Sequence, residues 1–231
     1  MEFTAKKIAE ICDGKLIKDN GKTVKKVCID SRKVENGDLF VALIGETHDA
    51  HKFVYSSIQQ GAAAVLVSSD EIGDTLDASV IKVSDTLIAL QKLAHARRNE
   101  LDSFFVAVTG SNGKTTTRSM ITHILSGFAQ CSTTTGNLNN HIGLPLTILG
   151  IDTESKYSVL EMGMNHPGEI RTLCSIATPD AAVICNVGPA HIGILGSLEN
   201  IAKAKSEILE QLKPGSKVAL PGDSEYIDLL K

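Results

Sequence analysis

A lysine and two threonines follow a pair of glycines near the middle of the chain, in the segment Thr109-Gly110-Ser111-Asn112-Gly113-Lys114-Thr115-Thr116. The apolar, β-prone residues 104–108 precede this segment, and the helix-compatible residues 117–125 follow it. In a strand, turn and helix of this kind, backbone N–H groups and the positive end of the helix dipole face an anion. Lys114 would then reach the β- and γ-phosphates of a nucleotide, and the Thr115 hydroxyl would bind Mg²⁺.

This glycine turn departs from the general phosphate-loop pattern, which places a glycine five residues before the second one. Position 108 is Val108, so the glycines of this turn lie closer together. A β-turn before a surface helix is the alternative interpretation. The apolar strand before the turn and the hydroxyl residues after it favour the phosphate loop.

Two further polar residues lie at or just beyond the ends of apolar runs. Glu161 ends the run 157–161, and His191 follows the run 181–186. An unpaired carboxylate at a buried strand end is costly, whereas one beside Lys114 and Mg²⁺ is useful. The alternative for Glu161 is a helix cap or salt bridge, and the alternative for His191 is a surface or hydrogen-bonded side chain.

Lys205 lies on the apolar side of a helix predicted over 198–212. The apolar residues recur at helical spacing; they are Leu198, Ile201, Ala202, Ile208, Leu209 and Leu212. Lys203 falls on the opposite side with Glu199 and Glu207. A core-facing lysine can extend its ammonium to solvent, pair with a carboxylate, or lose its proton and react.

Hydroxyl and amide side chains crowd the segment 133–143, which includes Asn137, Asn139 and Asn140. Such a cluster is not expected in a core, and its neutral donors suit phosphate or sugar oxygens. A plain surface loop is the alternative.

The order of the predicted elements indicates an α/β protein. In the second half, apolar strands expected at 104–109, 157–161, 181–186 and 216–221 alternate with helices expected at 114–126, 167–177 and 198–212. This alternation predicts a mainly parallel sheet covered on both faces, with ligands outside the carboxyl ends of its strands.

The first half of the chain predicts a smaller α/β domain. Its helices are expected at 4–12 and 51–60, and its strands at 24–29, 38–43, 63–67 and 80–83. A further helix is expected at 85–101. We therefore expect one domain at 1–84 and another at 103–231, connected by 85–102.

The composition suits a folded domain with a local ligand site. Of 231 residues, 42% are hydrophobic, and the formal net charge is −4. This charge does not attract nucleic acid or an anionic membrane, and the chain has no Trp for base stacking. No apolar run is long enough to cross a bilayer, and residues 1–10 lack the apolar core of a signal peptide, so we expect neither a membrane-spanning segment nor a signal peptide. The five cysteines form no C-x-x-C pair, so we expect buried thiols in a reducing cytoplasm.

Motifs along the whole chain resemble those of the Mur ligase family. The N-terminal motifs are Asp30-Ser31-Arg32, residues 37–43 (GDLFVAL) and His51-Lys52-Phe53. The later motifs are the glycine turn, residues 135–140 (TGNLNN), Glu161-Met162-Gly163, residues 165–170 (NHPGEI) and residues 186–191 (NVGPAH). The NHPGEI and GPAH motifs are typical of the member that adds D-Ala-D-Ala.

The resemblance implies an ATP-dependent amide ligase of peptidoglycan synthesis. ATP would phosphorylate the C-terminal carboxylate of UDP-N-acetylmuramoyl-tripeptide, and the amine of D-Ala-D-Ala would attack the acyl phosphate. Such a site must neutralise charge on the moving phosphoryl group through positioning and cations. The expected protein is a cytoplasmic monomer that binds neither nucleic acid nor membrane.

The resemblance also implies roles for single residues. Lys114 would stabilise the β- and γ-phosphates, while Thr115 and Glu161 would hold one Mg²⁺. His191 would bind a second Mg²⁺, supported by a carbamylated Lys205. A core-facing position favours the neutral amine that takes up CO₂.

The substrate contacts implied by the resemblance come from both halves of the chain. Ser31 and Arg32 would contact the UDP moiety, and Asn137 the diphosphate or γ-phosphate region. With Asn139 and Asn140, these residues form the expected substrate-binding set.

The chain departs from the family in two respects. Family members often carry glycine where Ala50 stands, which disfavours a positive-φ turn before His51 here. They are also much longer. We therefore expect an N-terminal fragment that lacks the family's adenine-binding asparagines and C-terminal domain, and that alone shows negligible turnover.

Two other functions stay open. A stand-alone phosphate-loop module would bind ATP or GTP tightly without any UDP-muramoyl ligand. A sibling ligase would add a different amino acid, although the NHPGEI motif argues against it.

Overall fold

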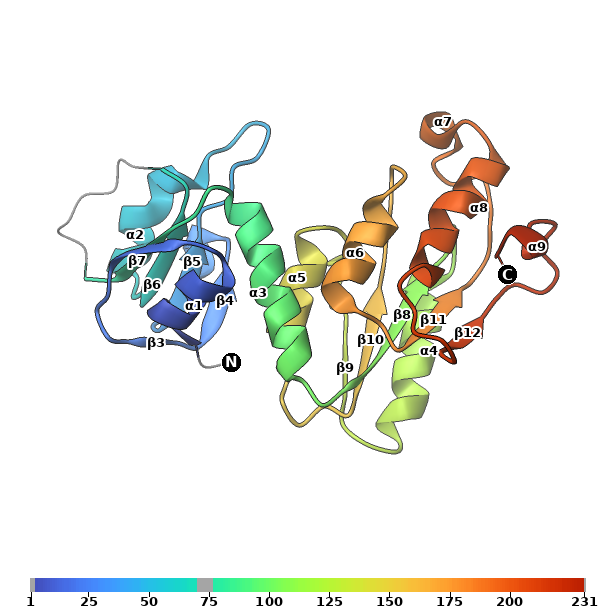
Figure 1. Cartoon of the computed structure of the whole chain (residues 1–231), viewed down its shortest axis with the longest axis horizontal. Coiled ribbons are helices and arrows are strands. Elements are labelled where there is room, and N and C mark those ends of the chain that lie inside the picture. The colour runs from blue at the N-terminus through green and yellow to red at the C-terminus, as the bar shows by residue number, and fades with distance from the viewer. Residues whose placement is uncertain (1–2, 70–76, 231) are drawn as a thin grey trace. The chain divides into compact units, whose positions relative to one another are not determined.

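The computed structural model describes residues 3–69 and 77–230, and the chain divides into two compact units. The division falls between Arg97 and Arg98, inside helix α3 (Thr86–Glu100). Each unit has its own five-stranded sheet (Figure 1). No helix within the described ranges is both long and apolar enough to cross a membrane.

The first unit contains a mixed sheet and a separate two-stranded ladder. The sheet order is β2-β7-β6-β5-β4; its strands are β2 (Lys15–Lys18), β4 (Lys26–Cys28), β5 (Asp38–Val41), β6 (Ala64–Val67) and β7 (Ser79–Lys82). Its neighbouring strands run parallel, except that β2 and β7 are antiparallel. The ladder pairs β1 (Phe3–Thr4) with β3 (Thr23–Val24).

Helices and short 3₁₀ segments complete the first unit. Helix α1 (Ala5–Ile11) begins as predicted, because the Thr4 hydroxyl accepts the Lys7 N–H at 3.2 Å. Helix α2 (Val54–Gln59) packs on one face of the sheet through Val54 and Ile58. The 3₁₀ segments are η1 (Ser31–Lys33) and η2 (Ala50–Phe53).

The second unit contains an entirely parallel sheet with strand order β12-β11-β8-β10-β9. Its strands are β8 (Phe104–Thr109), β9 (Cys131–Thr133), β10 (Tyr157–Glu161), β11 (Ala181–Ile184) and β12 (Lys217–Ala219). Strand β8 is central, with Glu161 paired to Val108 on one side and Ile184 paired to Thr109 on the other. The carboxyl ends of β8, β10 and β11 therefore meet at one edge.

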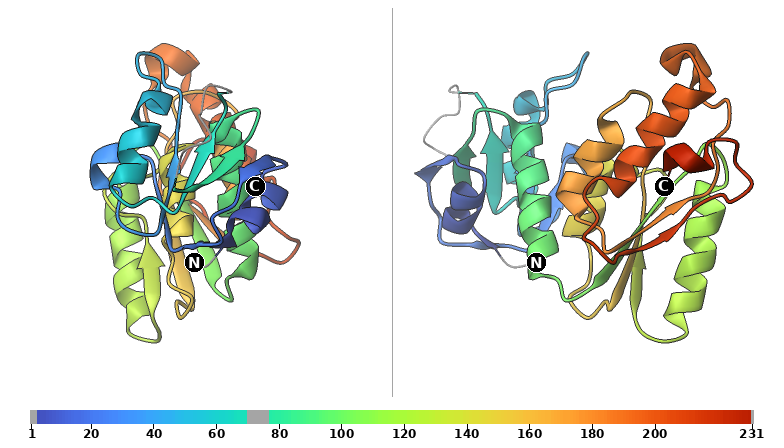
Figure 2. Two further views of the ribbon diagram at one scale, coloured as in Figure 1. Left: turned by 90° about the vertical axis from the view of Figure 1, so that its left-hand side faces the viewer. Right: turned by 45° about the vertical axis from the view of Figure 1, so that its right-hand side comes forward.

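Helices cover both faces of this sheet. Helix α4 (Lys114–Ser126) lies on one face, and α6 (Glu169–Ala177) and α8 (Leu198–Ser206) lie on the other (Figure 2). Every second strand residue faces α4. On this face, Val106, Val108 and Val159 pack against Ile121 and Leu125 of the helix. Further elements are α5 (Gly143–Leu149), α7 (Ile192–Leu195), η3 (Glu207–Leu209) and α9 (Ile227–Leu230).

The α/β class and the covered parallel sheet predicted from the sequence are confirmed. The sequence patterns do not indicate β9 or α5. Strand β9 has three half-buried residues and no apolar run, and α5 carries Pro145 in its first turn. Proline is tolerated there because first-turn N–H groups have no helical partner.

The helix predicted over 198–212 needs correction. Helix α8 ends at Ser206 and tightens into η3. Lys203 is exposed, as predicted, and pairs with Glu199 at 2.7 Å, but Glu207, predicted on the same exposed side, is only 4% exposed. Its carboxylate turns inward and accepts N–H groups at the start of α6. An amphipathic pattern does not indicate such a contact with another segment.

Candidate functional site

The segment between β8 and α4 forms a tight turn at the carboxyl edge of the second sheet. A Cβ on Gly110 would lie 2.8 Å from the Cβ of Cys185, so only glycine fits there. Gly113 immediately precedes α4 and has a φ of +75°, in the left-handed region that favours glycine. Both glycines are therefore required by the backbone, even though Val108 departs from the general pattern.

The N-terminus of α4 is open. Gly113 has no side chain to cap the helix, and the first N–H groups of a helix lack intrahelical partners. The Lys114 ammonium donates to the Gly110 carbonyl at 2.9 Å and lies 3.4 Å from the Ser111 carbonyl. Free N–H groups beside a lysine can hold the phosphates of a nucleotide.

The segment after β11 fixes the turn. The Asn186 carbonyl accepts the Ser111 N–H at 3.2 Å, and its side-chain carbonyl accepts the Asn112 N–H at 2.9 Å. The Ser111 hydroxyl donates to the Gly188 carbonyl and accepts the Gly188 N–H, both at 2.9 Å. Ser111 and Asn112 are thus bound by protein partners, and they preform the turn.

Glu161 brings three segments together at the end of β10. Its side chain is 4% exposed. Oε2 accepts the Thr115 hydroxyl and Oε1 accepts the Asn139 side-chain amide, both at 2.9 Å. The Glu161 N–H donates to the Thr134 hydroxyl at 2.9 Å. Residues far apart in the sequence therefore meet beside the glycine turn.

The oxygens of Thr115 and Glu161 fit a hard cation such as Mg²⁺. The hydroxyl and the carboxylate are adjacent, and Mg²⁺ is usually held by one or two carboxylates together with substrate phosphates and water. Within the part of the chain that the structure describes, no group of three or more His, Cys, Asp or Glu side chains could hold a metal. A metal here would therefore take further ligands from bound phosphate.

Arg118 belongs to this cluster, although the motif does not include it. It follows Thr115 by three residues, which places both on one face of α4, and it is 9% exposed. Its Nη1 donates to the Thr134 carbonyl at 2.6 Å and lies 3.7 Å from Glu161 Oε2. The helical spacing from Thr115 indicates that both residues lie on one face of α4, but it does not indicate that Arg118 is buried beside Glu161.

Lys205 is buried, as the apolar stripe predicts, with 2% of its surface exposed. Burial and, to a lesser extent, the positive charge of Lys114 lower its pKa, the Cys185 thiol acts in the opposite direction, and the resulting pKa is about 8. No carboxylate in residues 3–69 or 77–230 forms an ion pair with Lys205. Its burial and the lack of an ion pair in those ranges exclude the first two alternatives for a core-facing lysine, and the lowered pKa makes loss of the proton easier than for an ordinary lysine.

Other predicted residues of the second unit have varied surroundings. The Thr109 hydroxyl is buried and donates to the Met162 carbonyl at 2.9 Å, so it supports the strand ends. The Asn140 side-chain carbonyl accepts the Gly143 N–H at the start of α5. His191 precedes α7 with a φ of +65°, and its exposed side chain has no polar partner in the described ranges. Thr116 and Asn137 are exposed.

The residues predicted to bind UDP lie at η1 in the first unit. Ser31 is half-buried, and the Arg32 side chain is 85% exposed. The Arg32 guanidinium donates to both oxygens of Asp30, at 2.9 and 2.8 Å. These bonds lower the pKa of Asp30 to about 2. Arg32 is held by a carboxylate in the way a phosphate would hold it.

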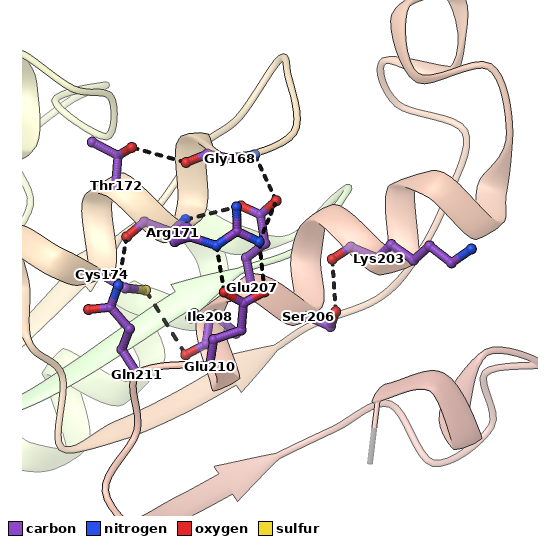
Figure 3. A network of polar contacts seen from close by, with 10 residues as sticks. All are labelled: Gly168, Arg171, Thr172, Cys174, Lys203, Ser206, Glu207, Ile208, Glu210 and Gln211. Carbon is purple, nitrogen blue, oxygen red and sulfur yellow. Dashed lines mark hydrogen bonds and ion pairs between the residues drawn. The ribbon is translucent and has the colours of Figure 1, made fainter.

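A second polar network lies beside α6 and η3 (Figure 3). Residues of this network also line a pocket of about 580 Å³. Glu207 Oε1 accepts the Gly168 N–H at 2.7 Å, and Oε2 accepts the Arg171 N–H at 3.1 Å. The Arg171 side chain binds Glu210 through two hydrogen bonds of 2.6 and 2.8 Å. Glu207 thus supplies the N-terminal cap that α6 lacks.

Known proteins match the chain in both sequence and structure. The family model described as Mur ligase family, catalytic domain, matches residues 23–98, and that of the Mur ligase middle domain matches residues 108–231. The UDP-N-acetylmuramoyl-tripeptide–D-alanyl-D-alanine ligase of Bacillus subtilis is 45% identical over 226 residues, which cover 97% of this chain and 50% of the relative.

Solved structures give the same result. A crystal structure of MurF from Acinetobacter baumannii matches with a TM-score of 0.92 and 35% identity, over 100% of this chain and 51% of that chain. MurF from Thermotoga maritima in complex with ADP matches with a TM-score of 0.82 and 33% identity, over 90% of this chain and 48% of that chain. The chain spans about half the length of the curated relatives it matches. On these matches, the chain belongs to the Mur ligase family.

Proposed function

We propose that this chain carries the ATP and UDP-sugar sites of a ligase that joins D-Ala-D-Ala to UDP-N-acetylmuramoyl-tripeptide in peptidoglycan synthesis. The observation that carries the proposal is the meeting of Thr115 and Asn139 on buried Glu161, beside the open start of α4. The name of the Bacillus subtilis relative supports the choice of substrates.

The proposed division of labour follows the order of the chain. Residues 1–84 bind the UDP-muramoyl substrate, and residues 103–231 bind ATP. Residues 85–102 connect these two domains. We propose that the protein acts as a monomer in the cytoplasm. Size-exclusion chromatography with light scattering measures the molar mass in solution and so tests whether the protein is a monomer.

In the proposed reaction, the γ-phosphoryl group of ATP passes to the C-terminal carboxylate of the tripeptide, giving an acyl phosphate and ADP. The amine of D-Ala-D-Ala attacks the acyl carbon, forms the amide bond, and releases phosphate and a proton. Lys114 and the free N–H groups of α4 hold the nucleotide phosphates. Bound phosphate competes with the Gly110 carbonyl for the Lys114 ammonium.

Thr115 and Glu161 are the proposed ligands of one Mg²⁺, which supplies charge neutralisation at the phosphates when bound. Asn139 fixes the Glu161 carboxylate from the other side. A carboxylate held in this way needs little reorganisation when the nucleotide arrives.

For a second Mg²⁺ we propose His191 and a carbamylated Lys205. A neutral amine adds to CO₂ to form a carbamate and release a proton, and burial favours the neutral amine. The lowered pKa of Lys205, about 8, supports this modification. The carbamate would convert a buried cation into an oxygen ligand.

Ser31 and Arg32 are the proposed contacts of the UDP moiety, and Asn137 is the proposed contact of the diphosphate or γ-phosphate region. Asn140 belongs to the same proposed substrate-binding set. Arg32 is exposed and already holds a carboxylate in a two-bond arrangement. A diphosphate oxygen can replace Asp30 as its partner, because guanidinium binds carboxylate and phosphate in the same geometry.

Calorimetric titration of the purified chain tests the proposal. UDP-N-acetylmuramoyl-tripeptide and a non-hydrolysable Mg²⁺–ATP analogue are added separately and then in sequence. We expect both to bind, with neither excluding the other. The variant Glu161→Gln should weaken the Mg²⁺-dependent nucleotide binding and leave the UDP-ligand titration unchanged.

Tight binding of ATP or GTP without any binding of the UDP-muramoyl ligand would contradict the ligase assignment. That result would favour the stand-alone nucleotide-binding module. Absence of nucleotide binding would contradict the role of the glycine turn.

A further inference from the structure

We propose that Arg118 is a positioning residue of the nucleotide site. It holds the Glu161 carboxylate and the Thr134 segment in their binding arrangement before nucleotide and Mg²⁺ arrive. That the ligands are a nucleotide and Mg²⁺ rests on the proposed function. That Arg118 holds Glu161 in place rests only on the contacts of Arg118.

Arg118 contacts Glu161 from two directions. Directly, its Nη1 lies 3.7 Å from Glu161 Oε2, the oxygen that also accepts the Thr115 hydroxyl. Indirectly, Nη1 donates to the Thr134 carbonyl at 2.6 Å, and the Thr134 hydroxyl accepts the Glu161 N–H. One guanidinium therefore restrains both the side chain and the backbone of Glu161, and it links α4 to the ends of β9 and β10.

Charge explains why an arginine occupies this position. The other side-chain contacts of the Glu161 carboxylate, Thr115 and Asn139, are neutral donors. Lys114 instead donates to carbonyls of the glycine turn. Within residues 3–69 and 77–230, Arg118 is the cation paired with this buried carboxylate. A buried carboxylate without a cation would be expensive to keep in place.

A role in packing alone does not account for Arg118. Its Nε–H is buried and has no hydrogen-bond partner in the described part of the chain. An unpaired buried N–H is destabilising, so an apolar side chain of similar length would satisfy packing better. Such a side chain would remove the positive charge that lies beside Glu161 and the hydrogen bond to the Thr134 carbonyl.

A double-mutant cycle tests the positioning without any ligand. Urea unfolding is measured for the unsubstituted chain, Arg118→Met, Glu161→Gln and the double variant. We expect Arg118→Met to raise the unfolding equilibrium constant about tenfold more when Glu161 is present than in the Glu161→Gln background. Equal effects in the two backgrounds would overturn the proposal.

The second measurement is the ratio of ATP dissociation constants without and with Mg²⁺. We expect this ratio to fall about tenfold in Arg118→Met and to recover largely in Arg118→Lys, which keeps the charge. The matched control Arg171→Met removes an arginine that pairs with Glu210, and it should leave the ratio unchanged.

The outcomes separate the two proposals. A purely structural Arg118 would weaken ATP binding equally with and without Mg²⁺, and that result overturns the positioning role. If the unsubstituted chain binds no ATP, the proposed function fails. The unfolding cycle still decides whether Arg118 positions Glu161.

Discussion

Two helices of the second unit begin in nearly the same way, yet their N-termini have different neighbours. Helices α4 and α6 follow β8 and β10 at the same edge of the sheet. Gly113 precedes α4 with a φ of +75°, and Gly168 precedes α6 with a φ of +86°; neither helix has a side-chain cap at its N-cap residue.

The difference lies in what faces the two helix starts. At α6 the Glu207 carboxylate accepts the N–H groups of Gly168 and Arg171. At α4 no side chain among residues 3–69 and 77–230 accepts the first N–H groups, and Lys114 lies beside them. The same local backbone is therefore capped by a carboxylate of the protein at α6, whereas at α4 its N–H groups remain available for phosphate.

The largest effect should come from removing the cation at the open helix start. We expect Lys114→Met to weaken Mg²⁺–ATP binding by roughly 100-fold, because charge-assisted hydrogen bonds to phosphate are lost. Calorimetry measures the change. Lys203→Met is the matched control, since Lys203 pairs with Glu199 on the exposed side of α8. Equal losses in both variants would contradict the special role of α4.

The buried Lys205 should give an effect of similar size, on the dependence of stability on pH. Between a pKa of about 8 in the folded state and 10.5 in the unfolded state, the unfolded chain binds more protons, so stability rises with pH. Lys205→Met should therefore be more stable than the parent below pH 8, by at most about 3 kcal/mol. This advantage should shrink as the pH rises from 8 to 10.5.

Urea unfolding of both proteins at pH 7, 8, 9 and 10 measures this difference. Cys12 and Cys174, whose pKa values burial raises to about 12, titrate equally in both proteins and cancel. A difference that stays constant across this range would show that Lys205 keeps its ordinary pKa.

Removing the Glu207 carboxylate should leave the first N–H groups of α6 without an acceptor, as those of α4 are within the described ranges. Glu207→Ala should cost about 1–2 kcal/mol of unfolding free energy, because the first N–H groups of α6 lose their acceptor. Sulfate or phosphate should restore part of this loss, compared with chloride at equal ionic strength, because an anion can occupy the vacated helix start.

The control for that comparison is Glu210→Ala, which removes the exposed partner of the Arg171 side chain. It should cost less stability and show no specific response to sulfate. The same response in both variants would mean that Glu207 is not the cap of α6.

The smallest effect on stability should come from Arg32 in the first unit. Arg32→Ala should leave the unfolding midpoint unchanged, because the Arg32–Asp30 pair is exposed. The same variant should weaken binding of UDP-N-acetylmuramoyl-tripeptide in a calorimetric titration, and Lys33→Ala should not. Unchanged ligand binding would remove Arg32 from the proposed UDP site.

The sequence predicts the main parts of the candidate site because each depends on short-range patterns. Gly113 and Lys114 stand between an apolar strand and a helix, and Glu161 ends the next central strand. Strand ends of a parallel sheet meet at one edge, so their proximity follows from the fold class. The burial of Lys205 follows from helical periodicity in the same way.

Arg118 and Glu207 show where such reasoning stops. Both are charged residues on helical segments, and the patterns place such residues on exposed faces. Each is buried because its partner, Glu161 or the start of α6, comes from a segment about 40 residues away. The same holds for Asn139, whose loop position predicts a ligand contact but whose amide binds Glu161.

The sequence by itself determined the strand–turn–helix order, the glycine positions of the turn and the buried face of α8, because these depend on local sterics and on periodic burial. Only the tertiary structure decided which helix start received an internal carboxylate and which stayed open, and which cation came to lie beside Glu161. Those choices depend on contacts between distant segments, and spacing along the chain does not specify them.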